Sequence, residues 1–168
     1  CFAVGRIMEV AGMQCAMLAD FLFATACHTI REQGFAVPTV KPWSRDLVFR
    51  KIDQAKEHGA QLLCMDIDAS GLPFLKNMTP PSGTKSVAEL KEIVELAGKP
   101  FIIKGIMTVK GALKAKEAGA AAIVVSNHGG RVLDQCPATA EVLPEIAEAL
   151  KGSGVKILVD GGIRTGVD

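Results

Sequence analysis

The sequence has no tyrosine, a single tryptophan and no Cys-x-x-Cys pair among its 168 residues. Without tyrosine, these 168 residues supply no phenol to an active site. Its five cysteines are odd in number and do not cluster with histidine, so the sequence predicts neither a disulfide framework nor a metal site. Unpaired cysteines are typical of a reducing compartment, and we expect the protein to be cytoplasmic.

The sequence also lacks an excess of either charge and a long apolar run. Nineteen Lys and Arg residues oppose eighteen Asp and Glu residues, which gives a formal net charge of +1. That balance argues against the basic surface that binds nucleic acid or anionic lipid. The mostly apolar stretch 11–26 is interrupted by Gln14 and Asp20 and falls short of the roughly 20 residues of a spanning helix. We therefore expect no nucleic-acid partner, no membrane partner and no signal peptide.

From residue 36 onward, short apolar runs alternate with amphipathic stretches that end in glycine. The runs are continuous, as in strands covered on both faces, and predict strands at 37–40, 61–67, 100–103, 121–125 and 155–159. The amphipathic stretches predict helices at 44–58, 86–98, 108–118 and 139–150. We expect a Ser86–Glu89 capping box, and N-caps at Thr108 and Thr139. Residues 1–35 are expected to hold one or two buried helices, with room for a sixth strand.

Polar residues end the predicted strands: Lys41, Asp66, Lys104, His128 and Asp160. In parallel α/β folds the chemistry gathers at these carboxyl ends. A doubly wound sheet would carry Gly-x-Gly-x-x-Gly in its first βα turn, which is missing here, so we favour a (β/α)8 barrel. A barrel needs about 250 residues. We therefore expect one partial barrel domain over 1–168, with five to six βα units, no final strand, and open edges through which the protein can form homo-oligomers.

Four segments carry residues suited to catalysis. In 126–134 (SNHGGRVLD), His128 can act as a base and Arg131 can bind a carboxylate. Lys104 suits a ligand that becomes anionic. The turn 160–166 (DGGIRTG) can offer backbone N–H groups and a guanidinium to a phosphate. Alternation along an extended strand would place Asp66 and Asp68 on one face, where they are either functional or merely solvated.

Together these segments resemble the FMN-dependent α-hydroxy acid oxidases and dehydrogenases, such as glycolate oxidase, lactate oxidase and flavocytochrome b2. SNHGGRVLD is the specific match, and the strands IIKG and MDIDASG and the turn DGGIRTG stand in the family's order over residues 36–168. The resemblance implies an FMN-binding (β/α)8 barrel that oxidises a small 2-hydroxy acid to the 2-oxo acid. By it, the chain runs from about the third strand to the seventh.

The resemblance also implies roles for single residues. It makes His128 the base, Arg131 the partner of the substrate carboxylate, and Asp68 the residue that orients the histidine. It places Lys104 and Ser126 at the flavin. It assigns the ribityl and phosphate groups to the turn formed by Asp160, Gly161, Gly162, Ile163 and Arg164.

The sequence departs from the family's usual pattern around the substrate. Lys41 replaces the usual tyrosine, Asp66 replaces a threonine, and the second substrate arginine has no counterpart. We expect Lys41 to supply the lost positive charge to the substrate. Two alternatives stay open: an FMN-dependent isomerase of the type 2 isopentenyl diphosphate isomerase kind, and a degenerate barrel without activity.

Overall fold

A single row of parallel strands forms the centre of the molecule. The computed structural model describes residues 18–19, 30, 36–72, 79–165 and 167. The strands are β1 (Leu18–Ala19), β2 (Val37–Val40), β3 (Leu63–Asp66), β4 (Phe101–Ile106), β5 (Ala122–Val125) and β6 (Lys156–Val159). Their order in the sheet is the order in the chain, and every neighbouring pair is parallel. A doubly wound sheet reverses its strand order at a switch point, and the described sheet contains no such reversal.

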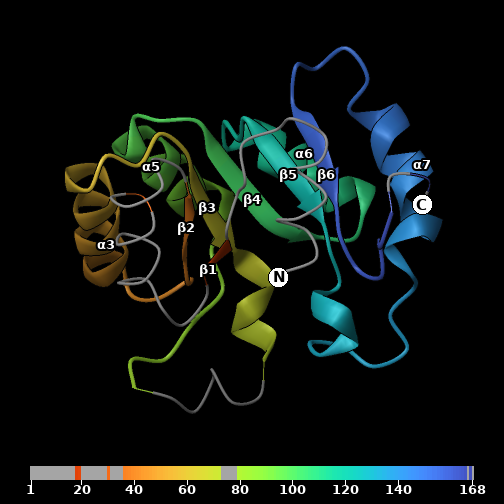
Figure 1. Ribbon diagram of the computed structural model, residues 1–168, viewed down its shortest axis with the longest axis horizontal. Helices are drawn as coiled ribbons and strands as arrows, with labels where there is room; N and C mark the ends of the chain where they lie inside the picture. The colour runs from red at the N-terminus through yellow and green to blue at the C-terminus, as the bar shows by residue number, and fades with distance from the viewer. Residues whose placement is uncertain (1–17, 20–29, 31–35, 73–78, 166, 168) are drawn as a thin grey trace.

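In the described part of the chain, four α-helices connect the strands from β2 to β6 and lie outside the row of strands (Figure 1). They are α3 (Arg45–Glu57), α5 (Val87–Ala97), α6 (Val109–Glu117) and α7 (Thr139–Ala149), and two short 3-10 helices, η1 (Ile67–Gly71) and η2 (His128–Gly130), follow β3 and β5. A strand, a crossover helix and a parallel neighbouring strand make up the repeating unit of a barrel. None of the described helices is long and apolar enough to cross a membrane.

The sheet has two apolar faces, as the continuous apolar runs predict. The outer face packs against the helices in the main core, where Ile52 of α3, Ile93 of α5 and Ile146 of α7 are buried. The inner face holds a smaller cluster: Val37, Cys64, Ile102, Ala122 and Val124. Since successive side chains of a strand point to opposite faces, the residues two positions further along also lie on the inner face. This alternation places the polar residues that end the strands together on the inner face of the sheet.

The helix ends mostly follow the predicted caps. Ser86 and Glu89 form a capping box, in which the Ser86 backbone N–H and hydroxyl both donate to Glu89 Oε2, at 2.7 and 2.8 Å. These two bonds stabilise the charged carboxylate and lower the pKa of Glu89. A second contact joins α3 and α5, where the Arg45 guanidinium donates to the Glu92 carboxylate and lowers the pKa of Glu92. Thr108 caps α6 by accepting from the Gly111 N–H.

Some of the expected details are wrong. Ala138, not Thr139, is the N-cap of α7, because the Thr139 hydroxyl donates to the Asp160 carbonyl instead. β4 continues past Lys104 to Ile106. β3 ends at Asp66, so the strand alternation expected to relate Asp66 to Asp68 does not apply. The helices expected in residues 1–35 lie almost entirely outside the described residues, within which Leu18–Ala19 is the short sixth strand.

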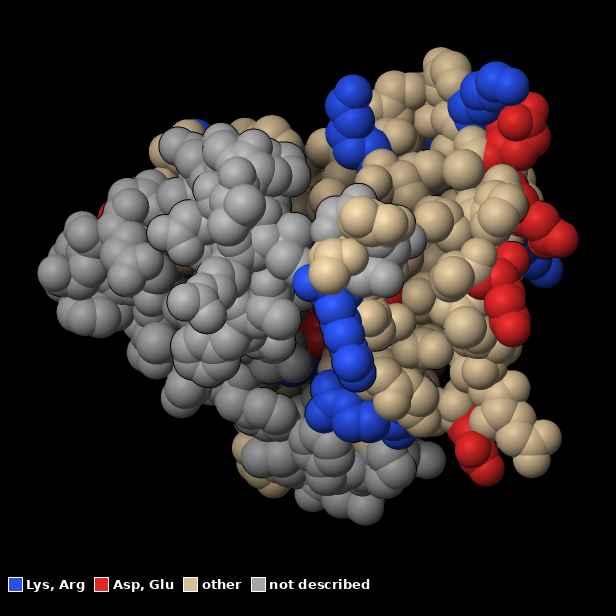
Figure 2. Space-filling model, turned by 45° about the vertical axis from the view of Figure 1, so that its right-hand side comes forward, with Lys and Arg blue, Asp and Glu red and all other residues tan. Residues whose placement is uncertain are grey.

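Side chains of both charges appear on the face shown in Figure 2. On the face shown in Figure 2, Lys and Arg side chains occur in small groups and acidic side chains lie on the same face. Neither sign forms an extended patch on that face. The distribution agrees with the near-zero net charge.

Candidate functional site

The inner face of the sheet changes from apolar to polar toward the carboxyl ends of the strands. Ile102 belongs to the inner apolar cluster, and Lys104, two residues on, faces the same side. The same step leads from Cys64 to Asp66 and from Val124 to Ser126. The polar side chains therefore share one end of the sheet, where parallel α/β folds carry their active sites.

His128 and Asp68 form the centre of this site. The imidazole Nδ1 lies 3.1 Å from Asp68 Oδ2 and 3.2 Å from Oδ1, and His128 is 6% exposed. Since a carboxylate only accepts hydrogen bonds, we assign the proton to Nδ1, which leaves Nε2 as the acceptor. A buried imidazole in this tautomer, held by a carboxylate, is arranged to take up a proton at Nε2.

Gly105 makes room for Asp68. Its φ is +95°, and a Cβ atom at this position would lie 2.4 Å from the Asp68 Cγ. No side chain fits in that space. The sequence alone does not predict this role, because the contact joins β4 to η1 and depends on the folded arrangement. The signal that the sequence does contain is the glycine directly after the strand-end lysine.

A second glycine lets η1 pack against the histidine loop. A Cβ atom on Gly71 would lie 2.7 Å from a methyl group of Val132. Val132 packs against buried Ala69 and Leu72. This apolar contact fixes η1, and with it Asp68, against the loop that carries His128.

The loop after β5 is held in shape by Asn127. Its Oδ1 accepts from the N–H groups of Gly129 and Gly130, at 3.1 and 3.3 Å, and its Nδ2 donates to the Pro137 carbonyl. Arg131 then donates from Nε to the His128 carbonyl at 3.0 Å. The bond uses Nε, so the two terminal NH2 groups of the exposed Arg131 can face a carboxylate.

Lys104 and Ser126 form a second polar group on the same face. Lys104 Nζ donates to Ser126 Oγ at 2.7 Å and lies 3.1 Å from Asp160 Oδ2. Ser126 Oγ also accepts from the His128 N–H at 3.3 Å. With both acceptor positions used, the hydroxyl of the buried Ser126 still has its hydrogen to donate.

The turn after β6 carries two glycines in the left-handed region, Gly161 with φ +91° and Gly162 with φ +97°. Thr139 Oγ1 donates to the Asp160 carbonyl at 2.6 Å and fixes the start of the turn. A Cβ on Gly162 would meet no described atom within 4 Å. A ligand can therefore reach the backbone at Gly162. Arg164, two residues further along the chain, is exposed.

Lys41 and Asp66 form a buried ion pair. Lys41 Nζ lies 2.5 Å from Asp66 Oδ2, and both side chains are 1% exposed. Asp66, Asp68 and His128 each place one polar atom within 4.8 Å of the others. A cation on Asp66 would face the Lys41 ammonium, so we do not interpret these three residues as a metal site.

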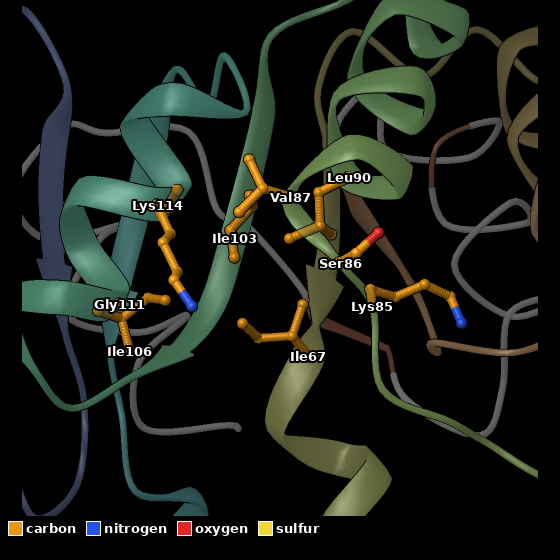
Figure 3. A pocket seen from close by; sticks show the side chains of 10 residues that line it. Ile67, Lys85, Ser86, Val87, Leu90, Ile103, Ile106, Gly111 and Lys114 are labelled. Atoms are coloured by element: carbon orange, nitrogen blue, oxygen red, sulfur yellow. The ribbon is translucent and has the colours of Figure 1, made fainter.

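A separate cavity of about 130 Å³ opens on the outer side of the sheet (Figure 3). It lies between α5 and α6, its lining is mainly apolar, and Ile67, Leu90, Ile103 and Ile106 supply much of it. None of the polar residues of the inner face lines this cavity. We therefore assign the chemistry to the polar inner face.

Comparison with known proteins defines the class. The family described as FMN-dependent dehydrogenase matches residues 74–168. A 2-hydroxyacid oxidase of Dictyostelium discoideum is 42% identical over 108 residues, which are 64% of this chain and 27% of that protein. An L-lactate oxidase of Lactobacillus jensenii is 49% identical over 79 residues, 47% of this chain and 19% of that protein. The chain belongs to the FMN-dependent dehydrogenase family.

Solved structures agree on the fold. A mandelate oxidase variant crystallised with 2-hydroxy-phenylacetamide has a TM-score of 0.77 and 26% identity over 98% of this chain. The match covers 53% of that mandelate oxidase chain. The described sheet is therefore a sector of a (β/α)8 barrel. The chain spans about half the length of the solved relatives and about a quarter of the curated ones.

The donor set of the inner face fits FMN. Lys104 and Ser126 offer an ammonium and a hydroxyl to a flavin edge, and Gly162 and Arg164 offer an approachable N–H and a guanidinium to a phosphate. Phosphate groups and reduced flavins are anionic, and these donors are two cationic groups, a backbone N–H and a hydroxyl. The chemistry of the donors matches that of the ligand.

Proposed function

We propose that the complete protein oxidises a small 2-hydroxy acid to the 2-oxo acid with FMN as cofactor. The observation that carries this proposal is the His128–Asp68 pair, with Nδ1 3.1 Å from the carboxylate, three residues before Arg131. A base and a carboxylate-binding group so close together match the two ends of a 2-hydroxy acid.

His128 is the proposed base. Oxidation of the hydroxy acid removes two electrons and two protons from the substrate, and FMN, when bound, would take up both electrons and one of the protons. Nε2 of His128 accepts the other proton, and the imidazole becomes an imidazolium. Asp68 holds the ring in the tautomer that accepts at Nε2, and its negative charge stabilises the imidazolium.

Arg131 is the proposed partner of the substrate carboxylate. Its Nε bond to the His128 carbonyl ties the guanidinium to the loop that carries the base. Binding of the carboxylate through the remaining NH2 groups places the adjacent hydroxyl-bearing carbon toward the imidazole. Fixing both reacting groups in this way lowers the entropic cost of the reaction.

Lys104, Ser126 and the turn from Asp160 through Gly161, Gly162 and Ile163 to Arg164 are the proposed FMN site. Lys104 is 11% exposed in its side chain and is anchored by Ser126 and Asp160. An anchored ammonium needs no reorganisation when negative charge develops beside it. The turn supplies backbone N–H groups and Arg164 for the phosphate.

The test uses the complete enzyme loaded with FMN. Without oxygen, glycolate, lactate or a longer 2-hydroxy acid is expected to bleach the visible absorbance of the flavin, and the 2-oxo acid is expected to accumulate. A yellow protein that none of these acids bleaches would refute the proposed reaction. A protein that stays colourless with added FMN would refute the cofactor.

We also propose that the protein works in the cytoplasm and associates with copies of itself. The free thiol of Cys136 suits a reducing compartment, although two related 2-hydroxyacid oxidases of Arabidopsis thaliana are peroxisomal. Cell fractionation tests the first proposal, and recovery in peroxisomes would contradict it. Sedimentation of the complete enzyme tests the second, and a monomer at all concentrations would contradict it.

A further inference from the structure

A second charge pair lies beside the His128–Asp68 pair. Lys41 directly follows β2 and Asp66 ends β3, and the register that pairs Val40 with Met65 brings the two side chains together. Their charged atoms are 2.5 Å apart and almost fully shielded from solvent. Removing either partner would take one charge out of a buried ion pair, which is strongly unfavourable. The two residues therefore work as a unit.

Asp66 is close enough to affect the base. Its carboxylate, the Asp68 carboxylate and the His128 imidazole place polar atoms within 4.8 Å of one another. At such a distance, in a partly buried site, a unit charge changes a protonation equilibrium by about one pH unit or more. An uncompensated Asp66 would therefore favour the imidazolium, which cannot accept a proton.

The other charged groups of the site are paired with one another or with His128. Among the described residues, the charged groups of the site are Lys41, Asp66, Asp68, Lys104, Arg131 and Asp160. Lys104 is paired with Asp160 at 3.1 Å, and Asp68 is bonded to the imidazole itself. Asp66 is the carboxylate whose pairing with Lys41 decides how much negative charge the base experiences.

We propose that the Lys41–Asp66 ion pair is a positioning element in which the lysine offsets the negative charge of Asp66 at His128. Asp68 is then the carboxylate that orients the imidazole and stabilises the imidazolium. The inference rests on the proposed function, because it treats His128 as the base. It also accounts for two departures from the family's usual residues together. The lysine and the aspartate occur together, and each is the ion-pair partner of the other.

This role differs from the expectation that Lys41 binds the substrate carboxylate. A substrate-binding lysine would change KM for the hydroxy acid and leave the pH profile in place. A charge-cancelling lysine shifts the acid limb of the profile of kcat/KM against pH. The direction of that shift depends on which partner is removed.

The test is a pair of single variants of the complete FMN-loaded enzyme, with opposite expected signs. Lys41→Met leaves Asp66 negative, favours the imidazolium, and moves the acid limb to higher pH by about one unit. Asp66→Asn leaves Lys41 positive, disfavours the imidazolium, and moves the limb to lower pH by a similar amount. The double variant returns the limb to near its original position. If one single variant does not fold, the sign of the other decides.

Lys114→Met is the matched control, because it removes the same charge on the outer side of the sheet, where Lys114 lines the separate cavity (Figure 3). It is expected to leave the limb in place. Shifts of both single variants in the same direction, or no shift in a folded single variant, would overturn the inference.

A readout without turnover separates this inference from the proposed function. In enzyme labelled with 13C-histidine, the ring signal of His128 is identified by its loss in His128→Gln. Its midpoint pH is expected to shift in the same opposite directions in the two single variants. These shifts in an enzyme that no hydroxy acid reduces would support the inference while refuting the proposed reaction, and their absence would refute the inference whatever the activity.

Discussion

Gly105 and Asp68 are in contact across two elements, since a Cβ atom on Gly105 would lie 2.4 Å from the Asp68 Cγ. Gly105→Ala is therefore expected to push Asp68 away from His128 and to strain the backbone at φ +95°. We expect a loss of about 1–3 kcal/mol in the free energy of unfolding and slower flavin reduction. Denaturant unfolding and stopped-flow absorbance measure the two effects.

Gly83→Ala is the matched control. A Cβ there meets no described atom within 4 Å, and the backbone is not in the left-handed region. It is expected to change neither stability nor rate appreciably. A Gly105→Ala enzyme that behaves like Gly83→Ala would show that Asp68 does not need this space.

Asp68→Asn tests the orientation of the base. An asparagine amide can hold the imidazole in the wrong tautomer and carries no charge to stabilise the imidazolium. The rate of flavin reduction at saturating hydroxy acid is expected to fall by about 10²- to 10⁴-fold. Asp134→Asn, an exposed change in the loop that follows His128, serves as the control and should keep the rate. A comparable rate in Asp68→Asn would contradict the role of Asp68.

Arg131→Lys tests whether Arg131 binds the carboxylate of the substrate. A lysine keeps the charge but cannot form two parallel bonds to a carboxylate. KM for the hydroxy acid is expected to rise about ten- to hundredfold, with a smaller change in kcat. A 2-hydroxy amide lacks the carboxylate, so the variant and the original enzyme should differ little with it. An equal loss with acid and amide would indicate general damage to the loop.

The capping box at the start of α5 gives a prediction about stability. Ser86→Ala removes the hydroxyl that accepts from the Glu89 N–H and is expected to cost about 1 kcal/mol of unfolding free energy at neutral pH. The pKa of Glu89 is lowered in the folded protein, so its charge contributes stability above the unfolded pKa. That contribution is lost as the pH falls through the lower folded pKa.

Glu89→Gln isolates the contribution of this charge. The stability difference between the original protein and Glu89→Gln should be largest at neutral pH and should disappear in acid, as measured by denaturant unfolding at several pH values. A difference that stays constant with pH would contradict the role of the Glu89 charge.

Much of the fold follows from local patterns in the sequence. The apolar runs match β2, β5 and β6 within one residue at each end, because strands buried on both faces need continuous apolar residues. The Ser86–Glu89 capping box forms because both partners lie within one turn of the chain. Such features depend on neighbours a few residues away and can be predicted without the fold.

The details that could not be predicted depend on contacts between distant segments. Thr139 looks like a helix cap but bonds to the Asp160 carbonyl, 21 residues away. The Lys41–Asp66 pair depends on strand register, and the space for Asp68 depends on Gly105 of another strand. The candidate base and arginine could be named from the motif, whereas the charges that surround them required the structure.

The most direct test of the account is the rate at which a 2-hydroxy acid reduces bound FMN, without oxygen, in the original enzyme and in His128→Gln. Glutamine can fill the space but cannot take up a proton, so we expect the rate to fall by about 10²- to 10⁴-fold while FMN stays bound. Flavin that is reduced equally fast in His128→Gln would contradict the claim that His128, held by Asp68, is the base.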